Sequence, residues 1–134
     1  MDEEYWFSKA AREDGSAEPK KRAGQGGNNK IEWETNNIYF YSEVTRVNNL
    51  YLNKQLVTLG NRYSNSANIL EVPDIHVNLY INSYGGSVFA GFSSVDYIKN
   101  SKVPVNTIID GCAASAATLM SVVGDKRFMR EHSF

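Results

Sequence analysis

Apolar residues follow two alternating patterns along the chain. Short runs rich in aromatic and β-branched residues predict buried strands, and the longer stretches between them carry apolar or small residues at helical spacing. The predicted strands cover residues 38–44, 75–81, 105–109 and 126–129. The predicted helices cover residues 46–63, 87–100 and 113–123. A polar connector is expected at residues 64–68, and Pro104 ends the second helix.

The order of these elements is β-α-β-α-β-α-β. Strands separated by helices of this length imply parallel pairing with right-handed crossovers, so the predicted fold class is α/β. Residues 1–36 differ in composition, because acidic and basic residues are mixed without a period and a run of glycine and asparagine follows them. We therefore expect a flexible, disordered N-terminal tail over residues 1–36 and one α/β domain over residues 37–134.

Composition narrows the classes of function. The chain has 134 residues and a formal net charge of −1 at pH 7, which suits one globular domain and gives no sign of a nucleic-acid partner. No apolar run approaches the roughly 20 residues of a membrane span, and the N-terminus lacks the pattern of a secretory signal. Cys112 is the only cysteine, so we expect no internal disulfide, a cytoplasmic protein, and a small buried side chain at Cys112.

Two loops carry the candidate chemistry. Gly85 and Gly86 follow the second predicted strand, and the segment Gly111–Ala117 follows the third. Because the carboxyl ends of parallel strands share one edge of a sheet, these loops are expected to be neighbours. Glycine backbone can present bare N–H groups to an oxyanion, and Ser115 stands among small residues at a helix start as a candidate nucleophile. Taken alone, the two glycines also fit a tight turn or a phosphate-binding loop. The alanines around Ser115 also fit a helix that packs closely against a sheet.

These motifs resemble those of the Clp protease proteolytic subunit family, the caseinolytic serine peptidases. The matching segments are Leu79–Ser83, Gly85–Ser87, Ala90–Gly91, Gly111–Ser115, Lys126–Phe128 and His132–Ser133, with residues 38–63 as the first β-α unit. The resemblance covers about residues 38–134, and Tyr84 departs from it where proline is usual. It implies a crotonase-like β-α-β superhelix with a parallel sheet and crossover helices, incomplete at the C-terminus.

The resemblance also implies a function, an ATP-dependent serine endopeptidase that cleaves unfolded polypeptides with a Ser-His-Asp triad. It assigns the nucleophile to Ser115, the oxyanion hole to the backbone N–H groups of Gly86 and Ala116, and the supporting loop positions to Gly85 and Gly111. It further implies self-association into rings and an unfoldase partner of the AAA+ class. The partner would use the ATP, so this chain is expected to need no cofactor and no metal.

The general base is the missing part of this predicted site. The resemblance places the family's histidine a few residues after Phe134 and its aspartate further on, so we expect a C-terminally truncated chain that is inactive or nearly so. His132 is a weak candidate base, because it occupies the motif position before the expected histidine. His76 should lie roughly 15 Å from the glycines at about 3.3 Å per strand residue, and Asp110 fits a turn-capping carboxylate better than a catalytic acid.

Three other interpretations stay open at this point. The chain could be a catalytically inert, peptidase-like ring or scaffold subunit, which the missing base favours. It could be a crotonase-fold enzyme that stabilises an acyl-CoA enolate with paired N–H groups, in which a nucleophilic serine has no task. A Ser-Lys peptidase would need a lysine near Ser115, and Lys126 follows the predicted helix but matches no pattern of that class.

Overall fold

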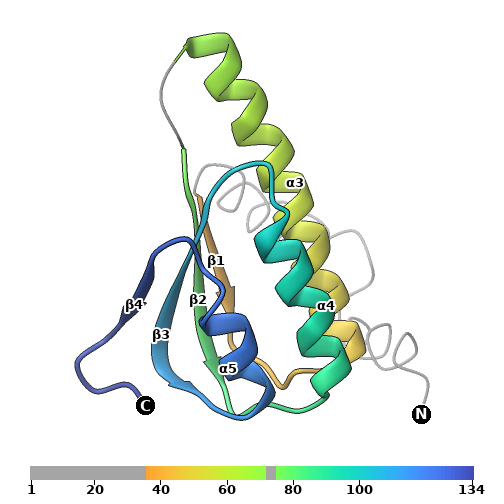
Figure 1. Ribbon diagram of the computed structural model, residues 1–134, viewed down its shortest axis with the longest axis vertical. Helices are drawn as coiled ribbons and strands as arrows, with labels where there is room; N and C mark the ends of the chain where they lie inside the picture. Colours follow the sequence, from red (N-terminus) through yellow and green to blue (C-terminus); the bar gives the residue numbers. More distant parts are fainter. Residues whose placement is uncertain (1–35, 72–74) are drawn as a thin grey trace, which may run out of the picture. The chain divides into compact units, whose positions relative to one another are not determined.

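The computed structural model describes residues 36–71 and 75–134, in which a parallel sheet is connected by helices (Figure 1). The strands are β1 (Asn37–Phe40), β2 (Val77–Ser83), β3 (Val105–Ala113) and β4 (Arg127–Met129). The helices are α3 (Arg46–Leu70), α4 (Val88–Lys99) and α5 (Ala116–Ser121). Neighbouring strands pair in parallel in the order β1-β2-β3-β4, which confirms the predicted α/β fold with crossover helices.

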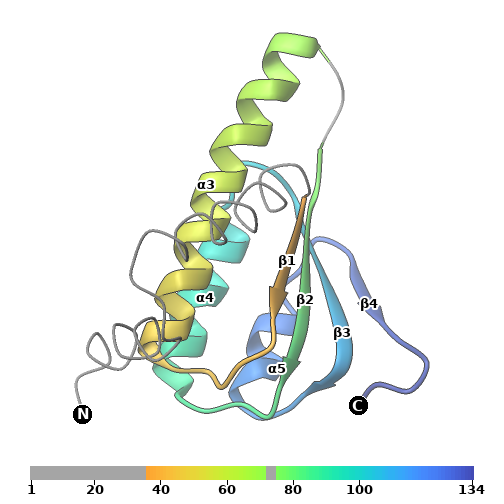
Figure 2. The same cartoon turned by 180° about the vertical axis from the view of Figure 1, so that it is seen from behind.

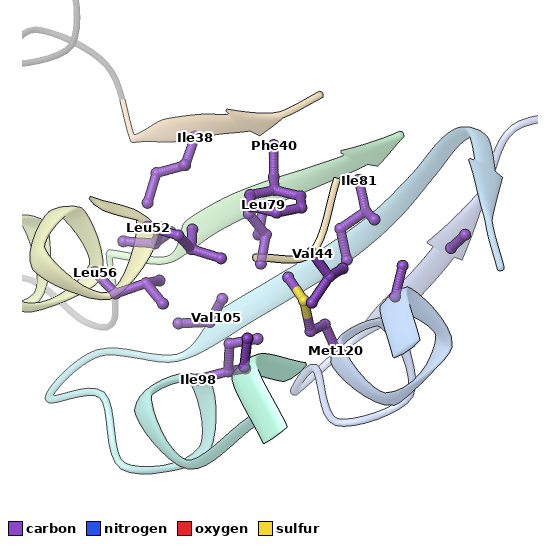
Figure 3. Packing of buried hydrophobic residues seen from close by; sticks show 14 of the residues in the cluster. Ile38, Phe40, Val44, Leu52, Leu56, Leu79, Ile81, Ile98, Val105 and Met120 are labelled. Carbon is purple, nitrogen blue, oxygen red and sulfur yellow. The ribbon is translucent and has the colours of Figure 1, made fainter. Parts of the chain in front are cut away.

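All three helices lie on one face of the sheet, as the opposite views in Figures 1 and 2 show. The burial of β2 explains this arrangement, since every odd-numbered residue of Val77–Ser83 is buried and every even-numbered residue is half-buried. A strand with this alternation buries one face only. The core therefore lies between the sheet and the helices (Figure 3). Its labelled members in Figure 3 are Ile38, Phe40, Val44, Leu52, Leu56, Leu79, Ile81, Ile98, Val105 and Met120.

The opposite face of the sheet carries polar and aromatic side chains. Asn78 donates its side-chain amide to Oδ1 of Asn37 at 3.1 Å, and Asn106 donates to Oδ1 of Asn78 at 3.2 Å, which forms a ladder across three strands. Beside this ladder, the rings of Tyr39 and Tyr80 stack with their centroids 4.9 Å apart. These cross-strand pairs fix the register of β1, β2 and β3.

Helix α3 is longer than predicted. The predicted connector at residues 64–68 is helical, and α3 ends at Leu70 with Glu71 in a left-handed conformation at φ 52°. The prediction was wrong because serine and asparagine cost only about 0.5 kcal/mol per residue in a helix, which is too little to end one. The next strong helix breaker in the sequence is Pro73.

Strand bounds near the carboxyl edge of the sheet also differ from the prediction. Strand β1 ends at Phe40 instead of residue 44, and Val44 makes a single parallel bridge to Gly86. Strand β3 continues past residue 109 to Ala113, so α5 begins at Ala116 and not at residue 113. The amides of Ala113 and Ala114 bond to other segments, which keeps both residues out of the helix.

The expected N-terminal tail lies almost wholly outside the described residues, so its flexibility stays a prediction. Within residues 36–71 and 75–134, no helix combines the length and the apolar character that crossing a bilayer requires.

Candidate active site

A bulge in β3 brings the two predicted loops together. Ile81 pairs with Ile109 and Ser83 pairs with Ala113, so an advance of two residues along β2 corresponds to four along β3. Gly111 lies in this bulge with φ 103°, and a Cβ there would stand 2.7 Å from Nδ2 of Asn82. Only glycine fits such a position without displacing its neighbours.

Ser115 sits at the sharp turn between β3 and α5. The N–H of Ala114 donates to the carbonyl of Ser83 at 3.0 Å, which anchors the turn to the end of β2. Ser115 then adopts φ 52° and ψ −127°, outside the regions that residues with a Cβ favour. Backbone strain of this kind costs about 1–3 kcal/mol and concentrates at functional sites. The serine is exposed, and its side chain does not cap α5, so the hydroxyl is available to a ligand.

Gly85 lies directly against this serine. A Cβ on Gly85 would stand 2.7 Å from Cβ of Ser115, 2.8 Å from the carbonyl oxygen of Ala114 and 3.1 Å from the amide nitrogen of Ala116. Gly85 has φ 106° and donates its N–H to Oγ of Ser83 at 3.1 Å. The two loops that the sequence predicted as neighbours are therefore in contact.

Two backbone amides at this contact have no hydrogen-bond partner among residues 36–71 and 75–134. Gly86 has φ 148°, and a Cβ on it would stand 2.3 Å from the carbonyl oxygen of Val44. That carbonyl accepts from Ser87 and the carbonyl of Gly85 accepts from Val44, so the N–H of Gly86 is left unused within the described residues. The N–H of Ala116, the first residue of α5, also donates no hydrogen bond there.

A cleft of about 660 Å³ opens beside the glycine pair. Its lining consists of the segment that follows β1 and the segment that ends β2, namely Tyr41, Ser42, Glu43, Asn82, Ser83, Tyr84, Gly85 and Gly86. The cleft thus borders Gly85, which in turn lies against Ser115.

A charged cluster stands at the same edge of the sheet. Arg130 forms an ion pair with Asp110, with 2.7 Å between Nε and Oδ1, and the hydroxyl of Tyr41 donates a hydrogen bond to the other carboxylate oxygen. This hydrogen bond, with smaller contributions from burial and from the carboxylate charge, raises the pKa of Tyr41 above its usual value near 10.0. Asp110 is therefore committed to Arg130 and Tyr41 and not to Ser115.

Replacing Asp110 by asparagine should lower the pKa of Tyr41. A raised pKa in the folded state stabilises the fold fully below pH 10 and loses that effect as pH rises through the folded-state value. The variant should therefore ionise one tyrosine at a lower pH in an ultraviolet titration, and Tyr41→Phe identifies which tyrosine that is. Asp125→Asn is the matched control and should leave the titration unchanged. A tyrosine titration that Asp110→Asn does not alter would contradict this role of the carboxylate.

The two histidines lie at opposite ends of the sheet's strands, and neither is hydrogen-bonded to Ser115 within the described residues. His132 is exposed in the turn after β4, and its role as a base stays a prediction. His76 lies just before β2, at the end of that strand opposite to the glycines. Its carbonyl oxygen accepts from Nδ2 of Asn36 at 2.7 Å, in keeping with a structural role.

The chain segment around Ser133 completes the edge of the site. Oγ of Ser133 accepts from the N–H of Gly111 at 2.8 Å and donates to the carbonyl of Ile109 at 3.0 Å. Phe134 then pairs with β3, since its N–H donates to Gly111 at 3.0 Å and its carbonyl accepts from Ala113 at 2.9 Å. These bonds hold the bulge in place from the side opposite to β2.

Metal chemistry finds no support in the described residues, where no three His, Cys, Asp or Glu side chains cluster closely enough to hold an ion. Cys112 is only partly buried, which corrects the expectation of a fully buried side chain.

Residues 41–43, which supply three of the eight lining residues of the cleft, were not predicted as part of the site. The rule that identified the loops after β2 and β3 also applies to β1, because these parallel strands end at the same edge. The signal was hidden because the first strand was predicted to continue to residue 44, which assigned these polar residues to the strand.

Comparisons with known proteins agree with this fold. A model of the Clp protease family matches residues 33–133. The ATP-dependent Clp protease proteolytic subunit of Leuconostoc citreum is 48% identical over 59 residues, which cover 42% of this chain and 30% of that protein. The solved structure of a ClpP1 mutant from Listeria monocytogenes matches with a TM-score of 0.65 and 26% sequence identity, over 78% of this chain and 56% of that chain. The chain thus spans about half of the solved relative and less of the curated one.

Proposed function

This chain belongs to the Clp protease family, and on that premise we propose that it is a serine peptidase subunit in which Ser115 is the nucleophile. The backbone N–H groups of Gly86 and Ala116 form the oxyanion hole in this proposal. Oγ of Ser115 attacks the carbonyl carbon of a peptide bond and its proton passes to a general base. The two amides stabilise the negative oxygen of the tetrahedral intermediate until the amine leaves, and water then hydrolyses the ester on Ser115.

The observation that carries the proposal is the strained, exposed Ser115 held against Gly85 beside two unused amides. Ala116 is buried, and a buried N–H without a partner is costly unless a ligand or water uses it. Gly86 is exposed, so its N–H is open to water until a ligand replaces it. The same observation disfavours an acyl-CoA enzyme, because enolate chemistry would need the amides but not a strained serine.

We place the general base on polypeptide that follows Phe134 in a complete site. The hydrogen bonds of Phe134 to Gly111 and Ala113 align the chain parallel to β3, so residues beyond it would approach Ser115. His132 precedes this pairing and lies further back along the strand. Histidine is the residue type that suits this role near neutral pH, and a carboxylate would orient it.

Assembly and substrate follow from the family relationship alone. We propose that the complete protein forms rings, receives unfolded polypeptide from an ATP-driven unfoldase, and cleaves it at Ser115 without a cofactor of its own.

A fluorophosphonate probe tests the assignment of the nucleophile. We expect the probe to label one site, slowly, and we expect added imidazole to accelerate labelling because it supplies the missing base. Ser115→Ala should abolish the label, whereas Ser66→Ala, on the far part of α3, should not. Absence of any label with imidazole present, or a label that persists in Ser115→Ala, would overturn the proposal in favour of an inert ring subunit.

A further inference from the structure

The cleft beside Gly86 carries one carboxylate that has no counter-ion. Asp110 is neutralised by Arg130 at 2.7 Å, but within the part of the chain that the structure describes Glu43 forms no ion pair. Glu43 is exposed and lines the cleft, and its Cγ stands 3.1 Å from where a Cβ on Gly86 would lie. A negative charge therefore borders the backbone to which we assign the oxyanion hole.

Two aromatic rings border the same cleft. Tyr41 is held in position by its hydrogen bond to Asp110, while Tyr84 is 85% exposed at the rim. Aromatic faces attract cations and also cover the aliphatic part of a long basic side chain. The remaining lining atoms come from Ser42, Asn82, Ser83 and the two glycines, which supply hydrogen-bonding groups and no positive charge.

We propose that this cleft binds a lysine or arginine side chain of a polypeptide held beside Ser115. Glu43 is the counter-ion of the basic group, and Tyr41 and Tyr84 form the aromatic walls. The inference rests on the proposed function, since it names the kind of polypeptide that the candidate active site prefers. Glu43 is then a specificity-determining residue and not a catalytic one.

Binding of short peptides to the 134-residue chain tests this inference. The peptides are fluorescein-labelled and identical except for a central lysine, arginine, norleucine or glutamate, and binding is read by fluorescence anisotropy. Because the exposed ion pair and the cation–π contact are each weak, we expect lysine and arginine peptides to bind about three- to tenfold more tightly than the norleucine peptide. The glutamate peptide should bind most weakly, and added salt should reduce the difference.

Glu43→Gln should remove the preference for basic peptides. Only the main-chain carbonyl of Glu43 is bonded, to Nδ2 of Asn48 at 3.0 Å, so the substitution leaves the local backbone intact. Asp125→Asn, which removes one exposed carboxylate outside the cleft, is the matched control and should keep the preference. Equal binding of the lysine and norleucine peptides, or a preference that survives in Glu43→Gln, would overturn the inference.

The outcome is separable from that of the probe experiment. A Glu43-dependent preference should persist in Ser115→Ala, because binding needs no nucleophile. Labelled Ser115 without any peptide preference would retain the peptidase assignment and reject the basic-residue cleft. A preference for basic peptides without labelling of Ser115 would retain the basic-residue cleft and reject the peptidase assignment.

Discussion

Replacing Gly85 by alanine is expected to destabilise the fold and to abolish probe labelling of Ser115. The new methyl group would meet Cβ of Ser115 at 2.7 Å and the carbonyl oxygen of Ala114 at 2.8 Å, both closer than a Cβ atom approaches in folded proteins. The backbone at φ 106° adds strain for any residue with a Cβ. Together we expect a loss of about 2–5 kcal/mol in the free energy of unfolding, from positive-φ strain and local overpacking.

The loss of labelling follows from where the overlap occurs. The elements that would have to move are the turn that carries Ser115 and the amide of Ala116, so relief of the overlap displaces the proposed nucleophile or a proposed oxyanion donor. Urea unfolding gives the stability, and fluorophosphonate labelling under conditions where the variant is folded gives the geometry. Both measurements are needed, because a folded variant that no longer labels locates the effect at the site.

Gly60→Ala is the matched control for this experiment. Gly60 is buried in α3 without a positive φ, and the closest atom to its added Cβ would be the side-chain oxygen of Ser101 at 3.2 Å, which can rotate away. The next atoms, from Lys102, stand at 3.7 Å and 4.0 Å, which is ordinary van der Waals contact. The gain of about 1 kcal/mol in helix propensity offsets the displacement of Ser101, so the variant should label normally and differ in stability by less than about 1 kcal/mol. If Gly85→Ala behaved like this control, the close contact between the two loops would be refuted.

The periodic parts of the sequence predicted the fold well because their signal is local. The alternation in β2 and the helical spacing of Leu52, Leu56 and Leu59 in α3 survive in the structure, as does the order of strands and helices. In α4 the small residues and Ile98 are buried, whereas Val88 and Phe92 are exposed. The parallel sheet followed because crossovers of this length allow little else. Bounds were wrong where tertiary hydrogen bonds decide, as at Ala113 and Ala114, whose amides bond to Phe134 and Ser83.

The candidate site was predictable in its residues but not in its geometry. Glycine pairs and a serine among alanines reveal that backbone amides and a hydroxyl are available, and parallel topology places them at one edge. The bulge at Gly111 and the strained angles of Ser115 depend on pairing between β2 and β3, which residue types alone do not encode. The part of Tyr41 and Glu43 in the cleft was missed because the first strand was predicted to continue to residue 44, whereas β1 ends at Phe40 and Val44 makes a single bridge to Gly86.

Leu52→Ala should strongly destabilise the fold, and it tests which face of α3 packs on the sheet. Leu52 is 1% exposed and belongs to the core, whereas Leu50, two positions earlier, is 54% exposed. Removing a buried leucine side chain costs about 2–5 kcal/mol, from lost transfer energy and the cavity left behind. Leu50→Ala makes the same chemical change on the solvent side, so we expect a loss below about 1 kcal/mol.

Because both substitutions exchange leucine for alanine within α3, helix propensity cancels and the difference reports burial alone. Urea denaturation measures the two free energies of unfolding. The slope of that free energy against urea concentration should be the same in both variants, since a changed slope would signal a different unfolded or native ensemble. The packing of α3 on the sheet also matters for the site, because the helix begins two residues after Val44. The N–H of Val44 donates to the carbonyl of Gly85, and its carbonyl accepts from the N–H of Ser87. Equal losses for the two variants would mean that α3 is rotated from the orientation described, and the anchor of the glycine pair would then need a different explanation.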